Sequence, residues 1–369
     1  MEANDAMGWV PMYYNDTLPN VTMTGEVEMF VEMHPVWIAT MCVFYIVVGF
    51  LGVFGNCIAL VALATTPKLR NTCTALIGNL CVTDLITSLQ LLFMMTPTQL
   101  LKGFPENLPL CTAVVYLPTT TYSVSLTTLM FIAFNRYLLI TRPRTCYRAC
   151  CGSKQVVLII ALIWLINFMI FILPSITGTR EVVYDREVQG CHAETNWLVG
   201  TIMMSFYVVV PAFVVVPLLY GLTICAVKAS HRRVHARSTA GGVGEQPSAL
   251  PPGHDGDVSL VSTVSNSVNN NLDDNAARHP RSISKRDINL TRLPILIFIV
   301  FAVCWTPQLI NHICSRFMKV SVYYRKVASL FIWVNCAINP YLYAWSNRNF
   351  RQAYRRILKN LKSNCKARL

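Results

Sequence analysis

Apolar residues along the chain gather into long runs that polar segments separate. A helix needs about 20 mostly apolar residues to cross the roughly 30 Å hydrocarbon core of a bilayer. Seven runs reach that length, at about 36–64, 72–97, 111–141, 155–175, 199–227, 289–314 and 327–346. The shorter alternating segments of a membrane β-barrel are not seen in the sequence. We therefore predict an all-α membrane protein, with a bundle of seven transmembrane helices over residues 36–346.

The composition argues against two classes of soluble protein. Hydrophobic residues make up 54% of the 369 residues and charged residues 13%, whereas a soluble domain carries about 25% charged residues. The sequence also shows no nucleophile with a base and no set of metal ligands. The net charge of +13 would suit a nucleic-acid binder, but the long apolar runs argue against one. We expect neither an enzyme nor a nucleic-acid partner.

Charge is distributed unevenly between the two ends of the chain. Residues 1–35 contain six acids and no base, whereas residues 347–369 contain eight bases and no acid. Lys and Arg favour the cytoplasmic side, and an odd number of spans places the ends on opposite sides. The sequence therefore predicts a multi-pass plasma-membrane protein with an extracellular N-terminal tail. Two sequons in that tail predict glycosylation at Asn15 and Asn20.

Two cytoplasmic segments have compositions of their own. Residues from about 229 to 287 connect the fifth and sixth runs, and their centre is rich in Gly, Pro, Ser, Asn and Asp. Such a composition predicts a disordered loop, whose basic ends would attract anionic lipid. After the seventh run, apolar residues recur at positions 350, 354, 357, 358 and 361. That spacing predicts a short amphipathic helix on the inner membrane surface, within a tail over 347–369.

The cysteines divide between the two sides of the membrane. Cys111 begins the third run, 25 residues before Arg136. At roughly 1.5 Å per residue, this separation places Cys111 at the outer face and Arg136 at the inner face. Cys191 lies in the other cysteine-bearing extracellular loop, so an oxidising exterior predicts a Cys111–Cys191 disulfide. Because no histidine or second pair accompanies them, reduced thiols are favoured over palmitoylation or a metal site at Cys146, Cys150 and Cys151.

Short motifs recur inside the runs in a fixed order. They are Gly55-Asn56, Leu80 with Asp84, Asn135-Arg136-Tyr137, Trp164, Pro211, Cys304-Trp305-Thr306-Pro307 and Asn339-Pro340-Tyr341-Leu342-Tyr343. On these residues the chain resembles the rhodopsin-like (class A) G-protein-coupled receptors over nearly its whole length. Within that family it is similar to melatonin-receptor-like and trapped-in-endoderm/moody-like receptors, with the medium-chain fatty-acid receptor nearby. Asn135-Arg136-Tyr137 and Tyr184-Asp185-Arg186 carry this narrower resemblance.

The resemblance implies a receptor that an extracellular ligand activates and that exchanges nucleotide on a heterotrimeric G protein, with arrestin and receptor kinases as further partners. Arg136 would meet the G protein, and Asp287 would hold that arginine in the resting state. The alternative for Asp287 is a solvent-facing side chain at the loop boundary. Prolines inside helices six and seven make places where a helix can bend. The residues assigned to coupling and switching are Asn135, Arg136, Tyr137, Asp287, Pro307, Pro340 and Tyr343.

Asp84 lies midway along the second run, where an ionisable group is costly and usually functional. Ser125, Asn335 and Asn339 are expected to join it in a polar cluster in the middle of the bundle. By resemblance, this cluster binds a sodium ion that favours the inactive state, and no other cofactor is expected. The alternative is a purely structural, hydrogen-bonded core.

Two positions depart from the family pattern. Asn135 replaces the acid that usually precedes Arg136, which removes an ion-pair partner and predicts higher basal activity. Tyr220 follows Pro211 by nine residues where the family spacing is eight, and Pro217 is the expected place of a local bulge.

The outer halves of the helices narrow the class of ligand. Amine receptors carry Asp at the position that Pro118 occupies here, and opsins carry their lysine where this chain has Trp333. An amine bound in the usual way and retinal are therefore disfavoured. An aromatic and neutral-polar cavity suits a small apolar or lipid-like molecule with a few hydrogen-bonding groups. The predicted lining is Thr119, Tyr122, Ser123, Trp305, Gln308, Asn311, His312, Ser329 and Trp333.

Alternatives remain for this outer region and for the whole protein. Bases at its mouth would attract a carboxylate or phosphate, or would simply be solvated: Arg180, Arg316, Lys319, Arg325 and Lys326. A melatonin- or indole-like ligand is a second possibility, although the histidine expected near Tyr207 is absent.

A transporter or channel is the rival class of protein. It would need inverted repeats or broken helices around a midplane site, and neither is visible in the sequence.

Overall fold

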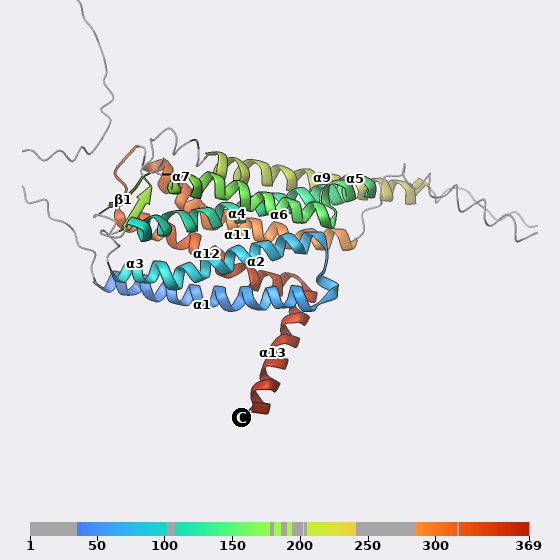
Figure 1. The fold of residues 1–369 in the computed structure, drawn as a ribbon. Helices are drawn as coiled ribbons and strands as arrows, with labels where there is room; N and C mark the ends of the chain where they lie inside the picture. The colour runs from blue at the N-terminus through green and yellow to red at the C-terminus, as the bar shows by residue number, and fades with distance from the viewer. Residues whose placement is uncertain are drawn as a thin grey trace, which may run out of the picture. The chain divides into compact units, whose positions relative to one another are not determined.

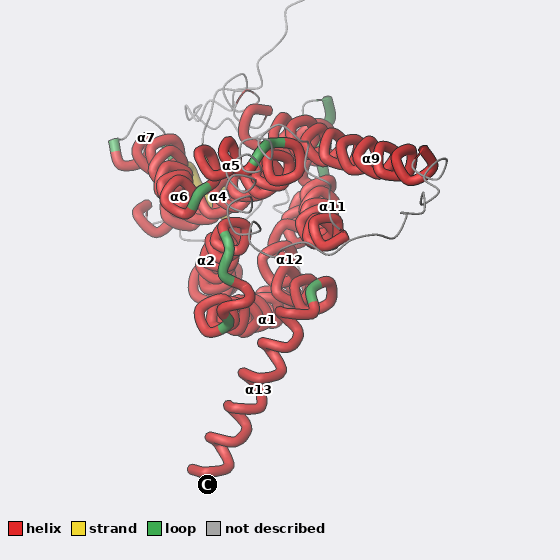
Figure 2. Tube along the Cα trace, turned by 90° about the vertical axis from the view of Figure 1, so that its right-hand side faces the viewer, coloured by secondary structure: helices red, strands yellow, loops and turns green. Residues whose placement is uncertain are grey.

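The computed structural model describes residues 35–101, 108–177, 181–185, 190–193, 202, 205–240, 285–315 and 317–368. In this part of the chain, seven helices are long and apolar enough to cross a membrane, judged by length and composition. They lie side by side in a bundle (Figures 1 and 2). The seven-helix architecture predicted from the apolar runs is therefore confirmed.

The bounds of the helices follow in chain order. The first three spans are α1 (Pro35–Thr65), α2 (Thr72–Gln90), which η2 (Leu91–Met95) and α3 (Thr96–Leu100) continue, and α4 (Leu108–Thr141). After the short α5 (Arg144–Cys151), the fourth span is α6 (Ser153–Asn167), which η3 (Phe168–Ile172) and α7 (Leu173–Ile176) continue. The remaining helices are η4 (Ser205–Val215) with α9 (Val216–Ala240), α11 (Lys285–Cys314), α12 (Val322–Ser346) and α13 (Arg348–Arg368).

The predicted loop over 229–287 is helical at both ends. α9 continues to Ala240, and α11 already begins at Lys285. Residues 241–284, like Asn15 and Asn20 in the N-terminal tail, lie outside the described residues. The disorder and glycosylation predictions therefore stay predictions.

Three helical stretches are wound more widely than an α-helix, as π-helical turns: η2, η3 and η4. A π-turn accommodates an extra residue within a helix. The 11-residue η4 contains Pro211, which has no N–H to donate. Because η4 absorbs the extra residue, Tyr220 still turns inward, where it is 5% exposed and its ring lies 6.0 Å from that of Phe298. The bulge was expected at Pro217. In the structure it lies before that residue, within Ser205–Val215.

Small residues let α1 approach its neighbours closely. Three glycines at every third position face α2 and α12: Gly49, Gly52 and Gly55. A Cβ atom at Gly55 would lie 3.1 Å from the ring of Pro340, and one at Gly52 would overlap the Ser88 hydroxyl. Asn56 then joins the helices, because its amide donates to the Cys336 carbonyl oxygen at 2.9 Å. Small residues serve helix packing in membranes in this way.

Replacing Gly52 with valine is expected to destabilise the bundle. The added Cβ would lie 2.9 Å from the Ser88 Cβ, so α1 and α2 would have to separate. Overpacking of this kind costs about 1–3 kcal/mol, and thermal unfolding of the purified protein would measure it. Gly221→Val is the matched control, since a Cβ at Gly221 meets nothing within 4 Å. Equal melting temperatures for the two variants would contradict this description of the α1–α2 contact.

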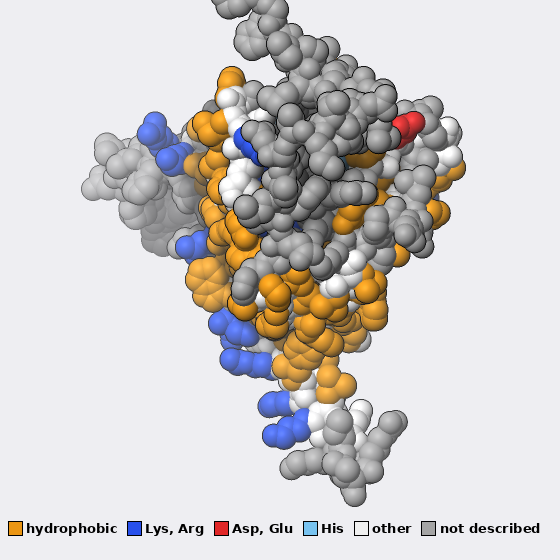
Figure 3. Space-filling model, turned by 90° about the vertical axis from the view of Figure 1, so that its left-hand side faces the viewer, with side chains coloured by type: hydrophobic (Ala, Val, Ile, Leu, Met, Phe, Trp, Pro, Cys, Tyr) orange, Lys and Arg blue, Asp and Glu red, His pale blue; other side chains and the backbone are white. Residues whose placement is uncertain are grey.

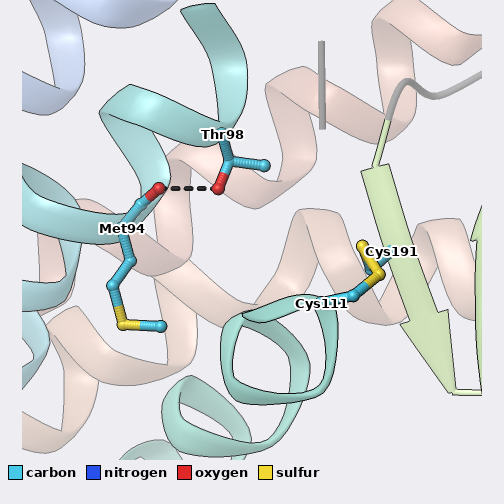
Figure 4. The surroundings of a disulfide bond; sticks show 4 residues. All are labelled: Met94, Thr98, Cys111 and Cys191. Atoms are coloured by element: carbon cyan, nitrogen blue, oxygen red, sulfur yellow. Dashed lines mark hydrogen bonds between the residues drawn. A yellow bond between two sulfur atoms is a disulfide. The ribbon is translucent and has the colours of Figure 1, made fainter. Parts of the chain in front are cut away.

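The outer end of α4 carries a short hairpin. β1 (Val182–Asp185) pairs antiparallel with β2 (Gly190–Ala193), and Tyr184 lies opposite Cys191. A disulfide joins Cys191 to Cys111 of α4, with the two Cα atoms 5.6 Å apart (Figure 4). The structure thus contains the predicted disulfide. The apolar runs gave no sign of the hairpin, because each strand has only four residues.

α13 begins directly after α12 and runs crosswise to the spans (Figures 1 and 2). Phe350 is fully buried, with its ring 5.3 Å from that of Tyr343, and Tyr354 donates to the Pro340 carbonyl oxygen at 3.3 Å. Burial raises the pKa of Tyr354, so its hydroxyl stays a donor. Lys and Arg side chains lie along one side of this helix, whereas hydrophobic side chains cover the flanks of the bundle (Figure 3). The predicted helix after the seventh span is confirmed.

Candidate functional site

Aromatic rings from four helices meet in the outer half of the bundle. Tyr122 of α4 lies edge-on to Trp305 of α11 and to Trp333 of α12, with ring centroids 5.7 and 5.4 Å apart. Trp305 also stacks on Phe301 at 5.5 Å, and Trp333 contacts Tyr45 of α1 at 6.3 Å. Aromatic pairs favour such offset and edge-on arrangements. The structure therefore brings three of the predicted ligand residues into one cluster, with Tyr122 at its centre.

The other predicted ligand residues differ in how their polar groups are used. Thr119 and Ser329 donate within their own helices, to the carbonyl oxygens of Val115 and Lys326 at 2.7 and 2.6 Å. His312 is partly buried, and Ser123 is buried on α4. Other buried polar atoms find no hydrogen-bond partner among the described residues: Tyr122 Oη, Trp305 Nε1, Gln308 Oε1 and Asn311 Oδ1.

Unsatisfied buried polar atoms are rare in folded proteins and call for an explanation, such as a water, an ion or a ligand. Three of these atoms belong to Trp305, Gln308 and Asn311, which follow one another at every third position of α11. Residues spaced in this way lie on one side of a helix. This side of α11 therefore offers hydrogen bonds that the described protein does not itself use.

At the outer mouth, only part of the predicted basic set can be placed. Lys326 donates to the Gln99 side-chain oxygen at 3.2 Å, which links α12 to α3. Arg325 is partly buried and Lys319 is exposed. Arg180 and Arg316 lie outside the described residues.

A polar core lies below the ring cluster, around Asp84. This side chain is 2% exposed, and the Asn339 amide donates to its carboxylate at 2.8 Å. Ser125, the third member of the predicted cluster, instead donates to the Thr83 hydroxyl at 2.7 Å. Asn335 is 3% exposed. The predicted residues thus lie in the bundle core, and one of the expected pairs is in direct contact.

The residues of this core fit a cation. The side-chain oxygens of Asn335 and Asn339 are buried without a hydrogen-bond partner among the described residues. A buried carboxylate also needs a compensating charge, and the side-chain hydrogen bond that Asp84 accepts among the described residues comes from a neutral amide, that of Asn339. Oxygen atoms of carboxylates and amides are ligands suited to hard cations. The side chains present would therefore suit a hard cation, and sodium binding at this core stays a prediction.

The inner end of α4 holds the predicted coupling residues. Arg136 is 6% exposed, and its guanidinium lies beside the Cys73 thiol of α2. Within the described part of the chain it forms no ion pair. Asp287 belongs to α11 by its backbone, but its side chain lies outside the described residues, so its predicted contact with Arg136 is not placed. Tyr137 is partly buried.

The three switch residues of α11 and α12 lie inside their helices. Pro307 lies within α11 two residues after Trp305, and Pro340 lies within α12. Tyr343 is fully buried beneath α13. Each proline removes a backbone hydrogen bond at a place where the helix can bend.

The structure adds a residue that sequence reasoning did not find. Tyr147 of α5 lies with its hydroxyl 2.7 Å from the Thr72 hydroxyl, and it accepts a hydrogen bond from the Asn135 amide at 3.3 Å. Asn135 is therefore anchored although it cannot form an ion pair with Arg136. In the sequence, the one signal for this contact was Asn135 itself, because an amide in place of the usual acid suits a neutral hydrogen-bond partner such as a tyrosine hydroxyl.

Side-chain hydrogen bonds also join α2 to α4 at successive turns. Thr87 donates to Thr121 at 3.0 Å, and Asn79 donates to Thr128 at 2.8 Å. Trp164 of α6 donates to the same Asn79 at 2.9 Å. The spacing of polar residues by four along α2 (79, 83, 87) could have indicated this polar face.

The comparisons with known proteins agree with this arrangement. The family model for the 7 transmembrane receptor (rhodopsin family) matches residues 55–343, from Gly55 of α1 to Tyr343 of α12. The chain belongs to this receptor family. It is therefore a G-protein-coupled receptor and a multi-pass membrane protein of the plasma membrane, not an enzyme.

Relatives of this receptor cover most of its length. Human G-protein coupled receptor 84 is 28% identical, over 85% of this chain and 91% of that protein. The mouse 5-hydroxytryptamine receptor 1D is 24% identical, over 96% of this chain and 97% of that protein. The structure of squid rhodopsin superposes with a TM-score of 0.68 at 17% identity, covering 94% of this chain and 93% of that one. This last similarity concerns the fold alone.

Proposed function

We propose that this receptor transduces a small apolar or lipid-like extracellular ligand to heterotrimeric G proteins, with arrestin and receptor kinases as further cytoplasmic partners. One observation carries the ligand class. Across the described spans, Asp84 is the only Asp or Glu, and Pro118 occupies the position at which amine receptors carry their acid. The ammonium group of an amine ligand would therefore find no carboxylate to pair with in the outer halves of the described spans. A neutral, apolar molecule has no such requirement.

The ring cluster supports the same ligand class. Tyr122, Trp305 and Trp333 are large apolar surfaces contributed by three different helices. Ligand sites are mostly apolar, with a few polar groups that fix the orientation of the ligand. The unused hydrogen-bonding atoms of Gln308 and Asn311 on α11 are suited to that second role.

A panel of probes would test the ligand class in cells that express the receptor. The panel contains fatty acids of graded chain length, lysophospholipids, melatonin and 5-hydroxytryptamine, and G-protein activation is the readout. We expect activation by a lipid probe and a loss of potency of roughly tenfold or more in Tyr122→Ala, since a buried aromatic side chain contributes about 1.5–3 kcal/mol. Phe93→Ala is the control, because Phe93 is 73% exposed on the outside of the bundle. Activation by an amine and by no lipid would contradict the proposal.

A second candidate is an amine ligand, which the mouse 5-hydroxytryptamine receptor 1D favours by its similarity over nearly the whole chain. Such a ligand would require an acid that the outer halves of the described spans do not supply. Melatonin, a neutral indole, is the third possibility. The panel separates the three by which probe activates the receptor.

Sodium is proposed as an inhibitory ion at the polar core. When bound, the cation would balance the Asp84 charge, with the oxygens of Asn335 and Asn339 as further ligands. These three side chains come from α2 and α12, so binding would hold the two helices in the resting arrangement. The buried, unpartnered amide oxygens support this assignment.

Replacing Asp84 with asparagine should remove the response to sodium. A ligand that binds only the folded, resting state raises its stability by mass action, so the melting temperature of the wild-type receptor should rise with sodium chloride relative to choline chloride at equal ionic strength. The rise should disappear in Asp84→Asn and persist in Thr121→Val, which changes the hydroxyl that Thr87 contacts. An equal rise in wild type and Asp84→Asn would place the ion elsewhere.

A further inference from the structure

The orientation of α5 is fixed by two side chains on one of its faces. Tyr147 is held by Thr72 of α2 and Asn135 of α4, at 2.7 and 3.3 Å. Cys151, one turn further along, is 3% exposed and interacts with the same Asn135. This face of α5 therefore packs on the bundle, and the remaining faces are turned outward.

Cys146 and Cys150 lie one turn apart on an outward side of α5, and both are exposed. Arg148 is exposed as well. At 3.6 residues per turn, each cysteine is about 200° around the helix from Arg148. The thiols and the guanidinium therefore lie on nearly opposite sides of α5, which makes it an amphipathic helix with its cysteines on the apolar side.

The surroundings of α5 are basic. Residues 141–154 contain four bases and no acid: Arg142, Arg144, Arg148 and Lys154. α5 ends at Cys151. The next residue, Gly152, has an extended backbone, with φ −67° and ψ 171°, and α6 begins just beyond it. A basic segment next to the inner ends of two spans is attracted to the anionic inner leaflet. α5 thus lies where exposed thiols reach the membrane surface.

We infer that Cys146 and Cys150 are sites of S-acylation, and that the attached chains anchor α5 in the inner leaflet. In this reaction each cysteine thiolate attacks the carbonyl carbon of a long-chain acyl thioester. A new cysteine thioester forms, the bond between the carbonyl carbon and the donor's sulfur breaks, and the departing thiol takes the proton that the cysteine lost. No electrons are exchanged, and the acyl thioester is the only co-reactant.

Two acyl chains beside four bases meet the known requirement for stable attachment, since a single chain gives only marginal binding. The sequence alone favours reduced thiols, because it does not show that Cys151 turns inward while the other two face outward. A metal site is not supported, since the described residues contain no group of three His, Cys, Asp or Glu that could hold an ion. The buried Cys151 should remain a free thiol.

Acylation is tested by hydroxylamine-dependent capture of the full-length receptor from mammalian cells. Cys365→Ser is the background for all variants, because Cys365 in α13 is a second candidate for acylation. Capture should fall to background when Cys146→Ser and Cys150→Ser are combined. When each acyl group is instead exchanged for a mass tag, the number of tags should fall from two to one in either single variant. Cys57→Ser with Cys225→Ser is the matched control, since both of these thiols are exposed, on α1 and α9, and neither has a second exposed cysteine on its helix. Unchanged capture in the α5 double variant would overturn the inference.

Mass spectrometry of the unmutated receptor shows which cysteines are acylated, even if a variant fails to reach the cell surface. Trypsin cleaves after Arg144, Arg148 and Lys154, so Cys146 is released in peptide 145–148 and Cys150 with Cys151 in peptide 149–154. Each peptide should carry one acyl group. Free thiols in both peptides would overturn the inference, and two acyl groups on peptide 149–154 would contradict the inward orientation of Cys151.

Discussion

Replacing Cys111 with serine is expected to remove most of the receptor from the cell surface. The disulfide with Cys191 closes a loop of 80 residues and holds the hairpin against α4. The chain-entropy model assigns roughly 4–5 kcal/mol to a loop of that length. Because α5, α6, α7 and most of α4 lie within this loop and already restrict it, about 2–4 kcal/mol is the expected loss. A loss of 2 kcal/mol corresponds to about a 30-fold change in the folding equilibrium.

Surface biotinylation of intact cells measures this effect. Cys191→Ser and the double variant should match Cys111→Ser, because the two cysteines act as a unit and their effects are not additive. Cys314→Ser is the control, since Cys314 is a free cysteine of intermediate exposure at the outer end of α11. If the double variant were far worse than either single variant, each cysteine would have a role apart from the bond.

The spans were predictable because membrane insertion imposes a strong pattern. Every spanning backbone group must be satisfied inside the helix, so long apolar runs have few other structures open to them. The boundaries were less accurate. The run over 289–314 corresponds to α11 from Lys285, and the run over 199–227 corresponds to η4 and α9, which together reach Ala240. The polar ends of these helices extend beyond the bilayer, so the pattern of apolar residues does not include them.

Contacts between helices were harder to predict than the helices themselves. The Asp84–Asn339 pair could be expected, because both residues belong to family motifs and lie at similar depth. The bond from Ser125 to Thr83 could not, since it depends on how α4 is rotated against α2. The same holds for Tyr147, which lies on a helix of only eight residues outside the apolar runs.

The π-turns show why residue counting fails along some helices. Counting from Pro211 placed Tyr220 one residue out of step with the family. The wide turns of η4 absorb that residue, and Tyr220 faces the core beside Ala133 and Val216. A period of 3.6 residues assumes a uniform helix, and a chain with π-turns departs from it.

Replacing Arg136 with alanine is expected to weaken coupling to the G protein severely. The guanidinium is buried at the inner end of α4, and within the described part of the chain no carboxylate pairs with it. It is therefore available to a partner that reaches the inner end of the bundle. A charged hydrogen-bonding group contributes about 1.5–3 kcal/mol, which predicts a drop of roughly ten- to a hundredfold in nucleotide exchange. Arg136→Lys should retain part of the activity, since it keeps the charge but loses the planar donor fork.

The central claim, that this chain signals through a G protein at Arg136, is tested most directly with purified components. The receptor in lipid nanodiscs is mixed with a purified heterotrimeric G protein, and uptake of a GTP analogue is measured with and without the lipid probes. Wild type and Arg142→Ala, which changes an exposed base six residues further along, should accelerate uptake. Arg136→Ala should leave uptake near the rate of the G protein alone. Equal acceleration by wild type and Arg136→Ala would contradict this account, as would a wild-type receptor that accelerates uptake under none of these conditions.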